Sequence, residues 1–461
     1  MNADRRTFLV AASGALASVA GCLGGDSDDT SNETDGNQST GNQSDGNQST
    51  GNGSGPQSVP EATRQFVDTL ESGQFDMAYQ QLSGQAQQLT SAGELEAVWL
   101  GFSAVGGSYG GIEGVETTVR SGFDAGNATL DFERGAHVMQ VVFGDNLTPR
   151  SAVVGDEYER PDYVDPASFE SQQLQLETES CKMDATVALP TDADTGDGVP
   201  GVVLVHGSDP VGAADKDLTN RGSKAFKDLG EGLATEGVAT MRYDRRTNAC
   251  PRSLEPSEYT LDAVSVDDAL LAIERLRETD GVDPDRIIVA GHSLGGLAMP
   301  RLVERDGNLA GGIGLAAPAR SFHEIFVDQF EYLATVGEFE WDRMQQAYEQ
   351  WRDRIDRIRQ GDYNPGDIVL SYPGALWDSV TAYDHIETAR QIDVPLFFLQ
   401  GSRDYQVTVE DDLSLWQSEL DGRQATTFRE YDGLNHLFKF GEGPSVPTAY
   451  PPGVCSASAS S

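Results

Sequence analysis

Basic residues are scarce in this chain of 461 residues, which has 32 Lys plus Arg, only five of them lysine, against 74 Asp plus Glu. The net charge of -42 repels phosphate backbones, so we exclude nucleic acid as a partner. Metal ligands are sparse too, because the six histidines are scattered and none of the four cysteines has the spacing of a zinc site. We therefore expect no metal centre.

The excess of acid also bears on stability. Self-repulsion of this size destabilises a folded chain unless salt screens the charges. A composition rich in acid and poor in lysine resembles that of proteins from salt-loving archaea, so we expect folding in concentrated salt. An ordinary acidic protein is the alternative.

The first 60 residues lack the pattern of a packed fold. Residues 1–21 contain the pair Arg5-Arg6 and an apolar stretch too short to remain as a membrane-spanning helix, which resembles a twin-arginine export signal. The sequence ending at Cys22 resembles a lipobox, so we expect a lipid on Cys22 that anchors an extracellular protein to the outer face of the cell membrane. Cleavage without lipidation is the alternative. Residues 22–60 repeat Gly, Asn, Gln and Ser, which predicts a disordered tether.

Three further cysteines, Cys181, Cys250 and Cys455, follow the predicted tether. An oxidising exterior permits a disulfide, but three thiols cannot all pair within one chain. A bond between Cys181 and Cys250 is conceivable, and the sequence leaves the pairing open.

The remaining chain shows two patterns. Residues 61–150 have apolar residues at helical spacing and then alternating strands, which predicts a small α+β accessory domain. Residues 172–461 alternate strands with helices, which is typical of an α/β fold with a mostly parallel sheet flanked by helices. An insertion at about residues 320–375 is aromatic, charged and helical in period, and it predicts a lid.

A short motif, Gly291-His-Ser293-Leu-Gly295, lies between a buried strand and a helix. Gly-x-Ser-x-Gly in that context predicts a sharp turn that lifts a serine hydroxyl above the sheet. We therefore interpret Ser293 as a nucleophile. An ordinary tight turn is the alternative.

A serine nucleophile needs a base. In folds of this kind the histidine follows the serine and the acid along the chain. His436 comes just after the last predicted strand, so we expect it to be the base. His323 and His385 precede the final two strands and are interpreted as lid or surface residues.

The base needs an acid, and the developing oxyanion needs N–H donors. Asp404 directly follows the penultimate predicted strand, and we favour it over Asp384 and Asp432. The backbone N–H groups of Ser208, after an earlier strand, and Leu294, after the serine, are the expected oxyanion hole.

Several separated blocks resemble one family: VVLVHGSDP, RYDRRT, VAGHSLGG, FLQGSRDYQV and GLNHLF. Together they are similar to a serine α/β-hydrolase family of bacterial and archaeal esterases related to dienelactone hydrolases. The preceding segment resembles a domain of unknown function found ahead of such hydrolases, so the resemblance spans about residues 61–445. It implies the α/β-hydrolase fold, esterase chemistry, and Ser293, Asp404 and His436 as the triad. One departure is the end of the chain, which lacks the helical period expected after the histidine loop.

The sequence thus predicts a secreted, cell-surface serine hydrolase that cleaves small-molecule carboxylic esters through an acyl-enzyme and needs no cofactor. A membrane contact is expected only through the lipid anchor. A serine peptidase of prolyl-oligopeptidase type shares the triad order, but no propeller-like repeat precedes the catalytic region. A non-catalytic surface-binding protein that kept the fold is the alternative from another class.

Overall fold

The structure is a computed structural model of the chain. It describes residues 56–87, 92–93, 95–96, 99, 102–103, 107–120, 123–133, 135–154, 158, 160–193, 198–208, 215–220, 223–336 and 341–445. The predicted export signal, the lipidation site Cys22, most of the predicted tether and Cys455 lie outside the described residues.

Helices open the described chain, and the first two lie where the apolar spacing predicts them. They are α2 (Val59–Glu71), α3 (Phe75–Gln81) and the short α4 (Gly84–Gln87). The Ser58 side chain accepts a hydrogen bond from the Glu61 amide and so caps α2.

An antiparallel sheet in the order β1-β2-β3-β4 follows. Its strands are β1 (Tyr109–Arg120), β2 (Phe123–Phe132), β3 (Gly135–Phe143) and β4 (Pro149–Val154). The first three confirm predicted strands, whereas β4 was not predicted because it is short and begins at a proline. The core between this sheet and α2 includes Phe66, Leu70, Leu130 and Met139.

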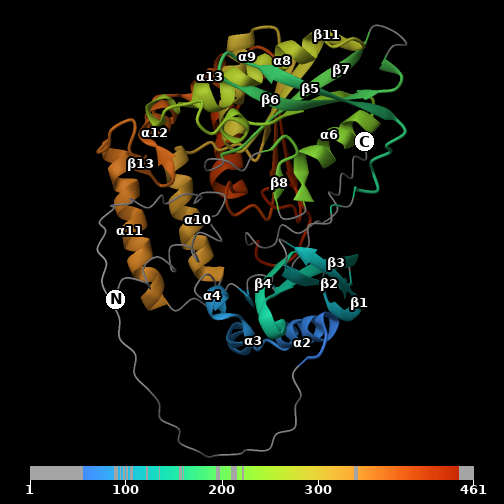
Figure 1. The fold of residues 1–461 in the computed structure, drawn as a ribbon. Helices are drawn as coiled ribbons and strands as arrows, with labels where there is room; N and C mark the ends of the chain where they lie inside the picture. Colours follow the sequence, from blue (N-terminus) through green and yellow to red (C-terminus); the bar gives the residue numbers. More distant parts are fainter. Residues whose placement is uncertain are drawn as a thin grey trace, which may run out of the picture.

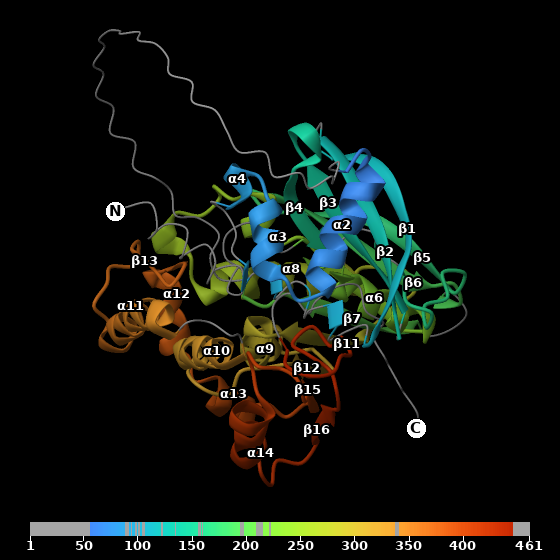
Figure 2. The ribbon, with the colours of Figure 1, turned by 90° about the horizontal axis from the view of Figure 1, so that it is seen from below.

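A second sheet of eight strands has the order β16-β15-β12-β11-β7-β10-β6-β5, and Figure 2 shows part of this sequence as β11, β12, β15 and β16. The hairpin of β5 and β6 is antiparallel and β6 pairs antiparallel with β10, while the other neighbours are parallel. Their bounds are β5 Phe169–Glu177, β6 Lys182–Pro190, β7 Val199–Val205, β10 Ala239–Tyr243, β11 Val282–His292, β12 Gly311–Leu315, β15 Leu396–Gly401 and β16 Thr426–Tyr431. The mostly parallel sheet predicted from the strand–helix alternation is confirmed.

Helices cover both faces of this sheet (Figure 1). They are α6 (Ala225–Thr235), α7 (Arg246–Ala249), α8 (Asp267–Arg277), α9 (Leu294–Asp306), α13 (His385–Gln391) and α14 (Ser414–Glu419). Val203 and Val205 pack in one cluster with α8 and α9, whereas Val202 and Leu204 pack in another with Phe226 of α6. Successive β7 side chains point to opposite faces, so an unbroken apolar strand is what a sheet covered on both sides requires.

The predicted insertion contains α10 (Phe322–Val336) and α11 (Trp341–Gln360), which lie side by side in Figure 1. A small hairpin of β13 (Ile368–Val369) and β14 (Tyr372–Pro373) leads into α12 (Gly374–Thr381). Trp351 and Trp377 are buried and donate their indole N–H groups to the backbone carbonyls of Phe326 and Val369. These two tryptophans therefore pack the insertion.

Cys181, just before β6, forms a disulfide with Cys250, just after α7. The structure thus decides the pairing that the sequence left open. Residues 432–445 contain no helix after the histidine loop, and the rest of the segment without a helical period, residues 446–461, lies outside the described residues. Instead, Arg403 donates hydrogen bonds to the carbonyls of Glu442 and Gly443 and holds this segment.

Among the described residues, no helix has the length and apolar content that would let it cross a membrane.

Candidate active site

Ser293 lies at the turn between β11 and α9. Its backbone angles, φ 53° and ψ -119°, belong to a region that residues with a side chain rarely occupy. The Ser293 amide donates to the Leu315 carbonyl at the end of β12, and the Ser293 carbonyl accepts from Leu297 in the first turn of α9. The strained turn is therefore fixed from both the sheet and the helix.

The glycines that flank the serine are required by close backbone contacts. A Cβ atom at Gly291 would overlap the carbonyl group of Gly295. One at Gly295 would lie 2.5 Å from the carbonyl oxygen of Val205 in β7. Close backbone contacts thus exclude a side chain at each end of the motif, as the sharp strand-to-helix turn predicts.

Asp404 and His436 meet although 32 residues separate them. Asp404 follows β15 and His436 follows β16, and these neighbouring parallel strands end at the same edge of the sheet. The Nδ1 atom of His436 lies 2.7 Å from Oδ2 of Asp404, with side-chain exposures of 6% and 0%. An ionised carboxylate can only accept, so Nδ1 carries the proton and Nε2 of neutral His436 keeps a lone pair.

His436 is also next to the serine turn. The His292 ring, one residue before Ser293, has its centroid 4.6 Å from that of His436. Nε2 of His292 donates to the His436 carbonyl oxygen at 2.8 Å, because a carbonyl can only accept. The histidine loop is thus attached to the residue that precedes the serine.

Each oxygen of the Asp404 carboxylate accepts two hydrogen bonds. Its Oδ1 accepts from the amides of Gln406 and Val407, at 2.8 and 3.1 Å. Its Oδ2 accepts from the Gln400 side chain at 2.9 Å in addition to His436. Such contacts hold a buried carboxylate in one orientation.

The rival residues have other partners. His385 donates from Nε2 to the Ala319 carbonyl, and His323 on α10 pairs with the adjacent Glu324. Asp384 caps α13 by accepting from the Glu387 amide. These contacts are structural.

Asp432, the third rival, is exposed and accepts a hydrogen bond from the Ser402 hydroxyl. This contact shapes the turn before the histidine loop.

The two residues expected to supply the oxyanion donors both lie close to Ser293. Leu294 is the first residue of α9, where amides have no partner within the helix. Ser208 follows Gly207, and a Cβ atom at Gly207 would lie 2.8 Å from Cβ of Ser293. The loop after β7 therefore passes against the serine, and a helix N-terminus favours negative charge there.

Two buried histidines beside the site stay neutral. Burial, the largest cause, lowers the pKa of His206 to about 3, and the positive charge of Arg245 adds to this effect. Burial also lowers the pKa of His292 to about 3, helped by the neighbouring His436. Neither imidazole competes for the proton that a base at this site would take up.

The RYDRRT block braces the sheet edge. Arg242 pairs with Asp217, and Arg246 pairs with Asp268. The side chain of Asp244 accepts from the Lys216 amide. None of these contacts involves Ser293.

Sequence reasoning missed several residues that hold the triad candidates. Gln400 is a buried polar residue at the end of an apolar strand, and that contrast was the available signal. Asn435 accepts from the amides of Leu437 and Lys439 and closes the histidine loop. Lys439 is fully buried and pairs with Asp228 of α6, in a chain with very few lysines.

Known proteins resemble this chain in sequence. The model of the alpha/beta hydrolase family matches residues 202–441, just over half of the chain. The chain belongs to the α/β-hydrolase family. Esterase EstD of Thermotoga maritima is 32% identical over 393 residues, which cover 84% of this chain and 89% of that protein. The predicted fold class is confirmed, and the chain is a hydrolase of this family.

Solved structures are similar at a lower level. The Pyrococcus furiosus esterase Pf2001 is 17% identical with a TM-score of 0.39, covering 61% of this chain and 91% of its own. Est1E of Butyrivibrio proteoclasticus, solved with ferulic acid bound, is 15% identical with a TM-score of 0.40, covering 57% and 91%. Within the described ranges, no group of three or more His, Cys, Asp or Glu side chains is arranged to hold a metal.

Proposed function

We propose that this protein is a serine hydrolase that cleaves carboxylic esters of small molecules through an acyl-enzyme. The observation that carries the proposal is the buried hydrogen bond from His436 to Asp404, beside the strained turn of Ser293. Similarity to an esterase over most of both chains supports the choice of substrate class.

The proposed reaction has two balanced steps. The Ser293 Oγ atom attacks the ester carbonyl while Nε2 of His436 takes its proton, and the protonated imidazole then passes that proton to the leaving alcohol. Water attacks the acyl-enzyme in the second step, His436 again carries the proton, and Ser293 is restored as the carboxylic acid leaves. Asp404 keeps the imidazole in the tautomer whose unprotonated Nε2 can accept the serine proton, and it stabilises the imidazolium.

The amides of Ser208 and Leu294 are proposed to donate to the oxyanion of each tetrahedral intermediate. Both N–H groups belong to the main chain, which the fold keeps in place. These donors therefore need little reorganisation when the oxyanion develops. Loss of one such donor typically lowers turnover by about 10²–10³-fold. The chemistry requires no cofactor.

The location is part of the proposal: export through a twin-arginine signal, and anchoring to the outer face of the membrane by a lipid on Cys22. The Cys181–Cys250 disulfide supports it, because such bonds persist in oxidising surroundings. Fractionation of cells that express the full chain tests this, since Cys22→Ser should move the protein from the membrane to the medium. A protein that stays in the cytosol in both cases contradicts it.

The activity is tested by turnover of p-nitrophenyl acetate compared with an aminoacyl anilide, in molar KCl. We expect turnover of the ester and loss of that turnover in Ser293→Ala. Faster cleavage of the anilide would favour a peptidase, and no turnover of either by folded protein would favour a binding protein.

A further inference from the structure

Asp412 is a buried carboxylate that the proposed triad does not use. It lies in the turn Val409–Leu413, directly before α14, and its side-chain exposure is 0%. Its Oδ1 accepts from the amides of Ala319 and Arg320, at 3.0 and 3.2 Å. Ala319 is 93 residues away in the sequence, so this carboxylate joins two distant segments.

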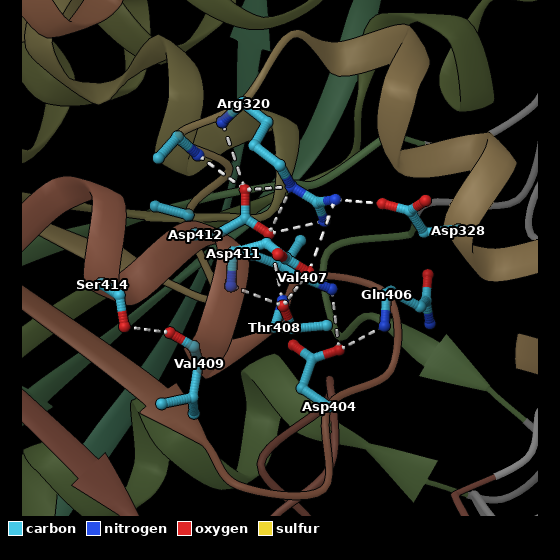
Figure 3. Close-up of polar contacts among 12 residues, drawn as sticks. Arg320, Asp328, Asp404, Gln406, Val407, Thr408, Val409, Asp411, Asp412 and Ser414 are labelled. Carbon is cyan, nitrogen blue, oxygen red and sulfur yellow. Dashed lines mark hydrogen bonds and ion pairs between the residues drawn. The ribbon is translucent and has the colours of Figure 1, made fainter.

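Arg320 supplies the opposite charge. Its Nη2 lies 2.9 Å from Oδ2 of Asp412, and its Nε contacts both oxygens at 3.3 Å. Nη1 of Arg320 also pairs with Asp328 on α10 and lies 3.7 Å from Oδ2 of Asp411 (Figure 3). A carboxylate this buried is tolerated because it is paired and fully hydrogen-bonded.

The pair reaches the catalytic acid through one short turn. Oδ2 of Asp412 accepts from the Thr408 amide at 3.1 Å, and the preceding Val407 amide donates to Oδ1 of Asp404, also at 3.1 Å (Figure 3). The Val407 carbonyl is held in turn by the Gln400 side chain at 2.7 Å. The turn that binds Asp404 is therefore fixed on its far side by Asp412.

The two segments leave adjacent parallel strands. Arg320 lies between β12 and the insertion helix α10, and the Asp404 turn follows β15. Asp412 and Arg320 thus fasten the acid loop to the loop from which the insertion starts.

We propose that Asp412 and Arg320 are positioning residues, which set the orientation of Asp404 and through it the hydrogen bond to His436. This inference rests on the proposed function of Asp404 and His436. A pair that only stabilised the fold would leave that hydrogen bond and the turnover of folded protein unchanged.

The test uses Asp412→Asn, which keeps the side-chain size and removes the charge, and Arg320→Lys, which keeps the charge and loses the fork of donors. The matched control is Asp306→Asn. Asp306 accepts two hydrogen bonds from Arg277, at 2.9 and 3.0 Å, and has 9% side-chain exposure. It lies at the far end of the 13-residue α9, about 20 Å from Ser293.

Two quantities are measured in molar KCl on variants whose circular dichroism shows a folded chain. One is the kcat and KM for p-nitrophenyl acetate, for which we expect kcat to fall about tenfold in both test variants while KM stays within about twofold. The other is the downfield proton NMR signal of the His436 Nδ1–H, identified by its loss in His436→Gln. We expect this signal to shift or broaden in both test variants and to be unchanged in Asp306→Asn.

Equal kcat values and an unchanged NMR signal in folded Asp412→Asn and Arg320→Lys would overturn the inference. Failure of the proposed function is a different result: the unmodified protein would then turn over no ester. In that case the NMR signal alone decides whether Asp412 and Arg320 orient the Asp404–His436 pair.

Discussion

The buried imidazoles of this protein differ in what their ring nitrogens bind. His206, His292 and His385 donate to backbone carbonyls, whereas His436 donates to the buried carboxylate of Asp404. A carbonyl fixes a neutral ring in place, but a carboxylate also stabilises the protonated ring that a base becomes. This difference favours His436 as the proton acceptor.

The neutral histidines make stability depend on pH. The pKa of His206 is about 3 in the folded protein and near 6.5 when unfolded, so the unfolded chain binds a proton more readily between these values. His206 therefore does not lower the free energy of unfolding above pH 6.5. As the pH drops from there toward about 3, the free energy of unfolding falls by about 1.4 kcal/mol per pH unit for each such proton.

The variant His206→Phe keeps an aromatic ring against Phe226 and Tyr243. We expect it to reduce the slope of the free energy of unfolding against pH by the contribution of about one proton. The free energy of urea unfolding, measured at constant KCl over this pH range, provides the slope. An unchanged slope in the variant would show that His206 is protonated in the folded state.

At the scale of elements, the disulfide joins the start of β6 to the segment after α7. Its two cysteines are 69 residues apart, so the bond restricts a long loop of the unfolded chain. Chain-entropy arguments give about 4 kcal/mol for a loop of this length, and measured values are commonly about 2–4 kcal/mol.

We expect Cys181→Ala with Cys250→Ala to lower the free energy of unfolding by about that amount while leaving kcat unchanged, because β7 and β10 lie between β6, next to the disulfide, and β11, which carries the serine turn. Urea unfolding at fixed KCl measures the loss, and addition of reductant to the unmodified protein is the matched control. Equal stability with and without the bond would contradict this expectation.

The arrangement of elements could be predicted to the extent that it depends on local sequence. Apolar runs marked the parallel strands, and the glycines around Ser293 marked the turn, since their steric reason lies within a few residues. The meeting of Asp404 and His436 follows from the order of strands. The contacts of Gln400 and Asp412 do not, because they join side chains to turns that only the folded packing brings together.

At the scale of the whole molecule, the net charge of -42 acts on every element at once. Ion pairs such as Arg320–Asp412 and Lys439–Asp228 neutralise only part of the acid excess. Salt shortens the range of repulsion from about 10 Å at 0.1 M to about 3 Å at 1 M.

We therefore expect the midpoint of thermal unfolding to rise steeply as KCl increases from millimolar to molar concentrations. An uncharged osmolyte at equal osmolality serves as the control, because it does not screen charge. A midpoint that does not depend on KCl would contradict the salt-requiring state predicted from the composition.

Covalent labelling can decide whether Ser293 is a nucleophile activated by His436. Folded protein in molar KCl is treated with a fluorophosphonate, digested and examined by mass spectrometry. We expect one phosphonylated peptide with the adduct on Ser293, and no adduct in Ser293→Ala. Absence of the adduct in the folded, unmodified protein, or its location on another serine, would show that Ser293 is not the activated nucleophile.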